Sequence, residues 1–262
     1  MHPPLTLDNH PICRERVLAL KRCHGEYVLG KFIGACNEEK WALDACLKEQ
    51  KLWKSRKNQE LARAQAPLRV VLGVSGSVAA IKFTELMGEL GALDASVEVK
   101  VVLTESARRF VSDAEIAEVK TCAWCSGVYT DDDEWSAWRK KGDPVTHVEL
   151  GKWADVLLVA PLSANTLAKF ANGSCDNLLT CLFRAWDVSN RDKIVCMAPA
   201  MNTQMWASPF TSRHMGAVAE VCASLRWLQP ISKELACGDT GVGAMMEPRD
   251  IAIAVHSFVR SP

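Results

Sequence analysis

Four cysteines near the N-terminus have the most regular spacing in the chain. Nine residues separate Cys13 from Cys23, and nine separate Cys36 from Cys46. Ten helical positions correspond to about 2.8 turns and about 15 Å, so each pair lies on nearly one helix face. If the two helices fold antiparallel, Cys13 meets Cys46 and Cys23 meets Cys36, and two nested disulfides staple a hairpin too small to be held by its core. Four reduced thiols, or a metal site, remain as alternatives.

Two further segments carry small and hydrogen-bonding residues where candidate strands end. Gly76–Val78 lies between a strand and a helix, where backbone N–H groups and serine hydroxyls bind phosphate. The three-glycine spacing of a dinucleotide site is absent, which favours a mononucleotide. Ser163–Thr166 follows another apolar run, and its polar side chains exceed what a helix cap requires. We therefore expect ligand contacts from both segments.

These segments lie in two regions with different patterns. Residues 14–23 and 36–63 are rich in Leu, Ala, Lys and Glu and are predicted to be helical. Beyond Pro67, short apolar runs alternate with amphipathic ones, which predicts an α/β fold with a doubly wound parallel sheet, flavodoxin-like or Rossmann-like. The predicted strands are 69–74, 97–103, 155–160 and 194–197, and the predicted helices are 78–90, 106–112, 164–172 and 177–185. The predicted domains are a helical hairpin, 1–63, a linker, 64–67, and an α/β domain, 68–262.

Composition excludes several classes of function. Thirty-one basic residues balance 31 acidic ones, which argues against a nucleic-acid partner. No apolar run approaches the length of a membrane span, and the first ten residues lack the apolar core of a secretory signal. Apart from Cys237, which is considered below, the cysteines outside the regular set are interpreted most simply as reduced core thiols, including the Cys122/Cys125 pair, and no resident metal is predicted.

The N-terminal spacing, with "HPIC" and "KFIGACNEEKWALDAC", resembles the twin Cys-x9-Cys family. Within that family, it is most similar to small assembly factors of mitochondrial cytochrome c oxidase. The resemblance implies the mitochondrial intermembrane space, where the import pathway oxidises such proteins, whereas the cytosol would keep the thiols reduced.

The remainder resembles the homo-oligomeric flavin-containing cysteine decarboxylases, and among them the phosphopantothenoylcysteine decarboxylases. The motifs are "GVSGSVAAIKF", "DDDEWSAW", "GDPVTHVEL", "WADVLLVAPLSANTLAKFANGSCDNLLTCLFRAWD", "APAMNTQMW" and "LACGDTGVGAM". The resemblance implies a cytoplasmic enzyme, a homotrimer with active sites between subunits, and FMN as cofactor. The FMN-binding residues that it implies are Gly76, Ser77, Val78, Thr104, Ser106, Ser163, Ala164, Asn165, Thr166 and Ala200.

The resemblance also assigns the chemistry. In this family, a flavin oxidises the substrate thiol to a thioaldehyde, which accepts the electrons released by decarboxylation. His147 is the expected acid/base, because an imidazole transfers protons near neutrality. Asn202 is expected to donate from its amide to the substrate carboxylate without adding a charge. Cys237 is expected to protonate the ene-thiolate from within a glycine-rich lid, 237–245. Further substrate contacts are expected from Met205, Ala236 and Met245.

Each assignment has a structural alternative: a structural histidine, a polar turn or one more buried cysteine. Three other functions are also considered. A peptidyl-cysteine decarboxylase would not need Cys237, and a phosphatase-inhibitory flavoprotein of the yeast type would split or lose the catalytic residues. Alternatively, the hairpin could set the function, as a mitochondrial assembly factor with a flavin domain as passenger.

Overall fold

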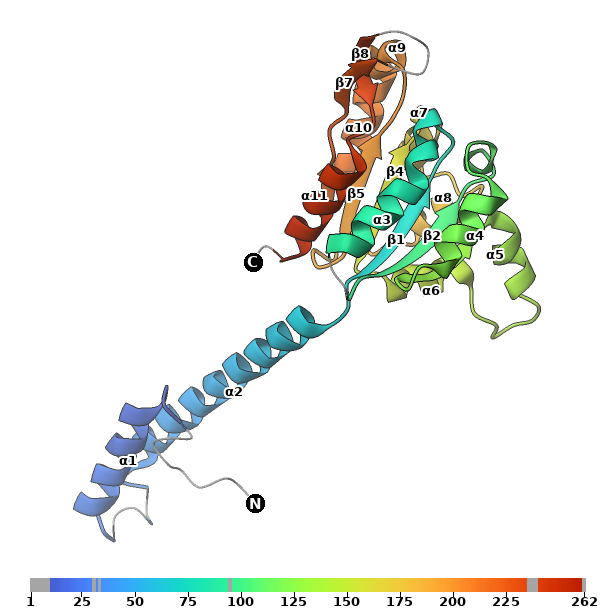
Figure 1. Cartoon of the computed structure of the whole chain (residues 1–262). Helices are drawn as coiled ribbons and strands as arrows, with labels where there is room; N and C mark the ends of the chain where they lie inside the picture. Colours follow the sequence, from blue (N-terminus) through green and yellow to red (C-terminus); the bar gives the residue numbers. More distant parts are fainter. Residues whose placement is uncertain (1–9, 30–31, 33, 94–95, 235–239, 261–262) are drawn as a thin grey trace. The chain divides into compact units, whose positions relative to one another are not determined.

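The computed structural model describes residues 10–29, 32, 34–93, 96–234 and 240–260 (Figure 1). The chain forms two compact units, Met1–Ala66 and Pro67–Pro262, which are treated separately below. None of the helices in the described ranges combines the length and apolar character that crossing a membrane requires.

The first unit is a helical hairpin built from α1 (Arg14–Glu26) and α2 (Asn37–Gln65). Disulfides join Cys13 to Cys46 and Cys23 to Cys36, with Cα–Cα distances of 5.9 and 6.0 Å, so the predicted disulfide-stapled hairpin is confirmed. Its core is small, with Cys13, Val17 and Leu43 buried. A core of this size is too small to stabilise the fold by itself, and the two disulfides supply covalent cross-links that stabilise it.

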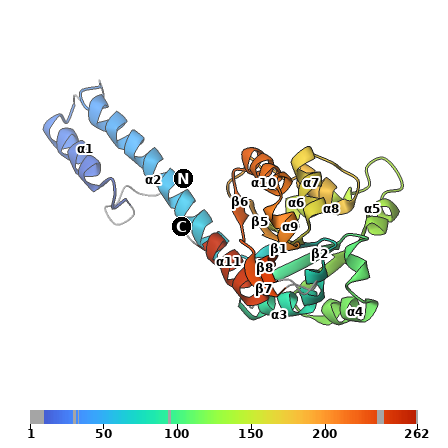
Figure 2. The same ribbon diagram turned by 90° about the horizontal axis from the view of Figure 1, so that it is seen from above.

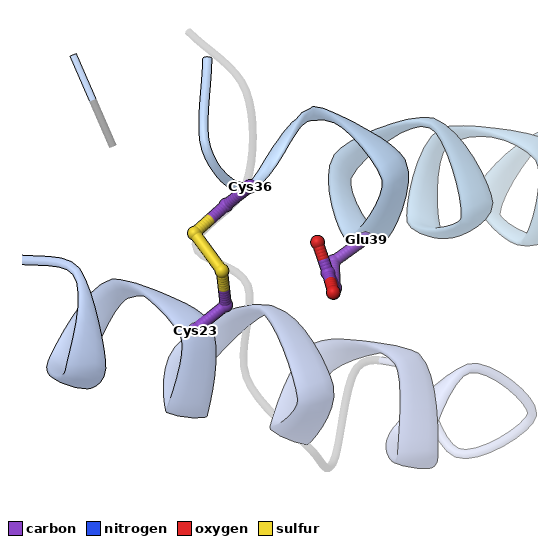
Figure 3. Close-up of side chains that lie close together, drawn as sticks. All are labelled: Cys23, Cys36 and Glu39. Atoms are coloured by element: carbon purple, nitrogen blue, oxygen red, sulfur yellow. A yellow bond between two sulfur atoms is a disulfide. The ribbon is translucent and has the colours of Figure 1, made fainter. Parts of the chain in front are cut away.

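One of these disulfides lies next to a carboxylate. Figure 3 shows Cys23 from α1 bonded to Cys36 at the start of α2, with Glu39 beside them. Because the two sulfur atoms are bonded to each other, they are not available as thiolate ligands for a metal ion. Helix α2 continues through Ala64 and Gln65, two residues that were predicted to belong to the linker.

The second unit is a six-stranded parallel sheet, which confirms the predicted fold class. Its strand order is β3-β2-β1-β4-β5-β6. The strands are β1 (Arg69–Val74), β2 (Glu98–Leu103), β3 (Cys125–Tyr129), β4 (Val156–Leu162), β5 (Ile194–Pro199) and β6 (Leu225–Trp227). Every residue of β4 and β5 is buried, as expected when helices cover both faces of a sheet.

Alternation along β1 sends side chains into two cores. Val70 and Leu72 enter one cluster, and Val71 enters the other. The first is covered by α3 (Phe83–Leu93), α4 (Asp113–Thr121) and α11 (Pro248–Arg260), and the second by α6 (Thr146–Trp153), α7 (Ala164–Asn172), α8 (Leu178–Arg184) and α10 (Pro209–Val221). Figure 2 shows the two layers from above. The remaining elements are η2 (Val78–Lys82), η3 (Ala107–Arg109), α5 (Asp131–Ala137), α9 (Thr203–Ala207) and an antiparallel hairpin of β7 (Ile231–Glu234) and β8 (Thr240–Ala244).

The helix predicted at 106–112 is wrong. Only the short 3-10 turn η3 forms there, and α4 begins after Ser112. The cause is a capping box: the Ser112 hydroxyl accepts from the Glu115 backbone N–H at 3.3 Å, and the Glu115 carboxylate accepts from the Ser112 N–H at 2.7 Å. This pairing starts a helix at the residue where the prediction ended one.

Candidate active site

Loops from four neighbouring strands converge at the C-terminal edge of the sheet. The chain runs outward from β1 through β2 to β3 on one side, and from β4 through β5 to β6 on the other. The order therefore reverses between β1 and β4. In open parallel sheets, ligands bind at such a switch point, beyond the carboxyl ends of the strands.

Serine hydroxyls connect these loops. Buried Ser75, just after β1, donates to the Pro161 carbonyl and accepts from the Ser163 N–H, both at 2.8 Å. The Ser77 hydroxyl donates to the Ala200 carbonyl at 3.1 Å, which links the loop after β1 to the loop after β5. Three loops far apart in sequence are thus held together by backbone and hydroxyl groups.

The loop after β2 completes the edge. Gly76 lies against Ser106: a Cβ atom added to the glycine would stand 2.4 Å from the Ser106 Cβ. Buried Thr104 donates to the Val74 carbonyl at 3.4 Å and accepts from the Ala107 N–H at 3.2 Å. Only glycine permits the close approach of these two loops.

Part of the loop after β4 serves as a helix cap, the structural role weighed above for Ser163–Thr166. Ser163 is the N-cap of α7, and its hydroxyl accepts from the Thr166 N–H at 3.2 Å. Ala164 is half-buried and Asn165 is exposed. The ten residues implied for FMN lie on these four loops or in the first turns of η2 and α7 that follow them, and all of them have uncharged side chains. A surface of backbone groups and hydroxyls beside a helix start suits a phosphorylated ligand.

His147 lies in the first turn of α6. Its Nδ1 atom is hydrogen-bonded to the Glu134 carboxylate of α5. The Glu134 side chain is 10% exposed and the His147 side chain 25% exposed, so the pair is shielded from water. A carboxylate on one ring nitrogen fixes the tautomer and leaves Nε2 to exchange a proton. Glu134 was not predicted as a site residue. The sequence feature that could have indicated it is the motif "DDDEWSAW", which served only to support the family resemblance.

The pair is held by contacts between helices. The Asp131 carboxylate accepts from the Leu178 N–H at 2.7 Å, which ties the start of α5 to the start of α8. Burial raises the pKa of Asp131, and the nearby Glu134 carboxylate adds to the rise. The Cys181 thiol of α8 lies near both His147 and Glu134.

The environment of Cys181 disfavours its thiolate. Burial raises the pKa of Cys181 to about 11, with the negative charge of Glu134 as the next cause and a hydrogen bond to the Cys175 thiol contributing further. Cys181 is therefore a protonated thiol at neutral pH, located in a cluster of carboxylate, imidazole and sulfur.

Asn202 lies two residues beyond Ala200, beside the switch point. It is the N-cap of α9, and its Oδ1 atom accepts from the Met205 N–H at 2.8 Å, which leaves the amide N–H groups to donate elsewhere. Asn202 is exposed and Met205 is 46% exposed. An exposed amide beside the loop after β5 can reach a ligand bound at the edge.

The β7–β8 hairpin packs onto this segment. The Met201 N–H donates to the Gly243 carbonyl at 3.0 Å. Gly243 has a φ of 146°, and an added Cβ would stand 2.3 Å from the Met201 carbonyl oxygen. The predicted lid thus contains a glycine that close packing requires. Cys237 and Ala236 lie outside the described residues, and Met245 is a core residue, 3% exposed.

Comparisons with known proteins agree with both units. Residues 58–260 match the model of the family described as Flavoprotein, and residues 1–66 match the family described as "Cytochrome c oxidase biogenesis protein Cmc1 like". The chain is 48% identical over 204 residues to the probable phosphopantothenoylcysteine decarboxylase of Arabidopsis thaliana, covering 78% of this chain and 94% of that protein. It is 52% identical over 188 residues to the phosphopantothenoylcysteine decarboxylase of Oryza sativa subsp. japonica, covering 72% and 79%.

Solved structures are similar as well. A PPC decarboxylase mutant complexed with pantothenoylaminoethenethiol matches with a TM-score of 0.67 at 48% identity, covering 74% of this chain and all of that one. The structure titled "The FMN binding protein AtHal3" matches with a TM-score of 0.65 at 49% identity, covering 74% and 98%.

Proposed function

The chain belongs to the Flavoprotein family, and we propose that it is an FMN-dependent decarboxylase that converts 4'-phosphopantothenoylcysteine to 4'-phosphopantetheine for coenzyme A biosynthesis. The observation that carries this proposal is the meeting of four loops at the switch point of the sheet, in a chain 48% identical to a probable enzyme of that name over 94% of its length.

The residues at this edge fit FMN. They offer hydroxyl and backbone groups, and the close packing of Gly76 on Ser106 keeps side chains out of the loop. FMN, when bound, supplies the two-electron redox chemistry of the reaction. Gly76–Val78, Thr104, Ser106, Ser163–Thr166 and Ala200 would hold it. The chain's own residues must then orient the substrate and move protons.

His147 is proposed as the acid/base. The Glu134 carboxylate accepts a hydrogen bond from Nδ1–H, so Nε2 is the atom proposed to take up or release a proton. Glu134 acts as a positioning residue, because its carboxylate holds the orientation of the imidazole ring. A homotrimer with active sites between subunits, which the family resemblance implies, is also part of this proposal.

Asn202 is proposed to hold the substrate carboxylate. Its Oδ1 atom is occupied by the Met205 N–H, so the group that faces substrate is the N–H donor. A neutral donor orients the carboxylate without the positive charge that would retain CO₂. Exposed Met205 is the proposed pocket wall, with Ala236 and Met245 as further contacts. Cys237 is the proposed donor that protonates the ene-thiolate after CO₂ has left.

Turnover by the purified, FMN-bound full chain tests this proposal. With phosphopantothenoylcysteine, we expect CO₂ and phosphopantetheine in equal amounts. We expect Cys237→Ser to release CO₂ and stop at the ene-thiol, while Cys122→Ser serves as a matched control for loss of a thiol. If the FMN-bound protein releases no CO₂, the proposed decarboxylase activity is refuted. A Cys237→Ser variant that still forms phosphopantetheine would refute only the role of that residue.

The role of Glu134 has a separate readout. We expect Glu134→Gln to lower kcat with little change in KM, because His147 loses the carboxylate that orients its ring. A merely structural role would lower stability and leave kcat of the folded, FMN-bound variant unchanged.

The hairpin supports a second function, oxidase assembly in the mitochondrial intermembrane space. Two disulfides close it, and residues 1–66 match the Cmc1-like family. Such disulfides form in oxidising compartments. The test is thiol alkylation of protein from its own cells, before and after reduction, together with fractionation of mitochondria. Protein in the intermembrane space whose reduction exposes four additional thiols in residues 1–66 supports this location, and a cytosolic protein with those thiols already reduced refutes it.

A further inference from the structure

Three side chains that bind metals meet beside the candidate acid/base. Glu134 of α5, His147 of α6 and Cys181 of α8 place one ligand atom each within 4.8 Å of one another. Bonds from zinc to N, O and S are about 2.0–2.3 Å long, so two ligand atoms of a tetrahedral ion lie about 3.3–3.8 Å apart. Small side-chain rotations would bring this cluster into range.

A fourth candidate ligand lies next to Cys181. The Cys175 thiol precedes α8, is exposed, interacts with the Cys181 thiol and donates to the Gly173 carbonyl at 3.7 Å. The Asp131–Leu178 hydrogen bond holds the start of α5 against the start of α8, so the helices that carry Glu134 and Cys181 are fixed relative to each other. The set comprises a carboxylate, an imidazole and two sulfurs, from three helices and one loop.

From this geometry we propose that Glu134, His147 and Cys181, together with Cys175, form a binding site for zinc. Thiolate and imidazole ligands favour Zn²⁺ over Mg²⁺ and Ca²⁺, which prefer all-oxygen sites. Because zinc binds thiolates, each cysteine thiol that becomes a ligand releases its proton to solvent, and zinc affinity should rise with pH. The partial burial of the cluster limits competition from water.

Zinc in this site would inhibit the enzyme. The ion takes the imidazole of His147 as a ligand and separates it from Glu134, so His147 can no longer transfer a proton. This consequence rests on the proposed function, whereas metal binding itself rests only on the cluster.

Zinc binding is measured first, on the FMN-loaded full chain with its hairpin disulfides intact. Competition with a chromophoric chelator gives the affinity and stoichiometry, and cadmium NMR reports sulfur ligands. We expect one zinc per chain in the wild type. We expect the same in the Cys122→Ser/Cys125→Ser control, which removes two other thiols. Cys181→Ser should weaken binding at least about a hundredfold, because changing even an outer-shell partner costs roughly 10- to 100-fold.

Several outcomes would overturn the proposal: no stoichiometric binding by the wild type, unchanged affinity in Cys181→Ser, or loss of binding in the control or in Cys237→Ser instead. Retained FMN shows that each variant is folded, and Glu134→Gln, which should weaken binding about tenfold, provides a second variant of the site. Zinc inhibition is then compared with each variant's own metal-free rate. Absence of decarboxylation without metal would refute the proposed function while leaving the binding result intact.

Discussion

Replacing Gly76 by alanine tests how the loops at the switch point are built. The new Cβ atom would stand 2.4 Å from the Ser106 Cβ and 3.2 Å from its carbonyl carbon. Carbon atoms in ordinary contact lie about 3.5–4.0 Å apart, so one loop must move by about 1 Å. Overpacking of this kind costs about 1–3 kcal/mol. If the cost falls on the ligand-binding conformation, FMN affinity drops roughly 5- to 150-fold.

The assay is fluorescence titration of the apoprotein with FMN. Gly88→Ala is the matched control, because Gly88 lies inside α3 and an added Cβ meets no described atom within 4 Å. We expect this control to bind FMN like the wild type and to gain up to about 1 kcal/mol of stability, since alanine favours a helix.

A double-mutant cycle identifies the contact. Ser106→Gly removes the atom nearest to the new methyl group, so Gly76→Ala should cost less in the Ser106→Gly background than in the wild type. The remaining backbone contacts, at 3.2 and 3.3 Å, should leave a residual penalty. Wild-type FMN affinity in Gly76→Ala, or strictly additive effects in the cycle, would refute the reasoning.

Three more predictions concern stability. The Cys13–Cys46 and Cys23–Cys36 disulfides close 33 and 13 residues, so removing either should cost the hairpin about 3.7 or 2.9 kcal/mol, measured as loss of its helical circular dichroism on denaturation. Ser112→Ala should cost about 0.5–2 kcal/mol in urea unfolding and raise the pKa of Glu115, which the Ser112 hydrogen bonds now lower. Asp131→Asn should raise Tm at pH 7, because burial raises the pKa of Asp131 and so penalises its ionised form in the folded protein. The stability linked to this raised pKa is fully present below the pKa of Asp131 in the unfolded chain and is lost as pH rises through its pKa in the folded protein. The increase in Tm should therefore vanish in acid. An unchanged hairpin, an unchanged Glu115 pKa or a pH-independent gain would contradict the respective prediction.

Residues with strong local signals were placed correctly from the sequence. The predicted strand at 69–74 matches β1, because its continuous apolar run is what a doubly covered strand requires. The helix at 164–172 matches α7, which Ser163 caps and Gly173 ends in the left-handed conformation. The cysteine spacing gave the disulfide pairing because helical periodicity fixes which thiols share a face.

Features that depend on tertiary contacts could not be predicted from the sequence. Strand β3 is only half-buried, and without a long apolar run it did not stand out from a loop. Glu134 belongs to a stretch of four acidic residues, and only the fold shows that it alone pairs with the candidate histidine. Gly243 was read as a source of mobility, whereas its packing on Met201 gives it a steric role. The roles assigned to the site residues remain predictions.

The two units impose opposite requirements on their cysteines, and burial reconciles them. The hairpin needs an oxidising compartment to form its disulfides, whereas the cysteines that the structure describes in the flavoprotein unit are free thiols. Thiol exchange requires the thiolate, and burial raises the pKa of Cys196 to about 12 and also raises that of Cys222. These core thiols therefore stay protonated under the conditions that oxidise the hairpin. Burial thus withholds Cys196 and Cys222 from exchange, whereas exposed Cys175 has no such protection.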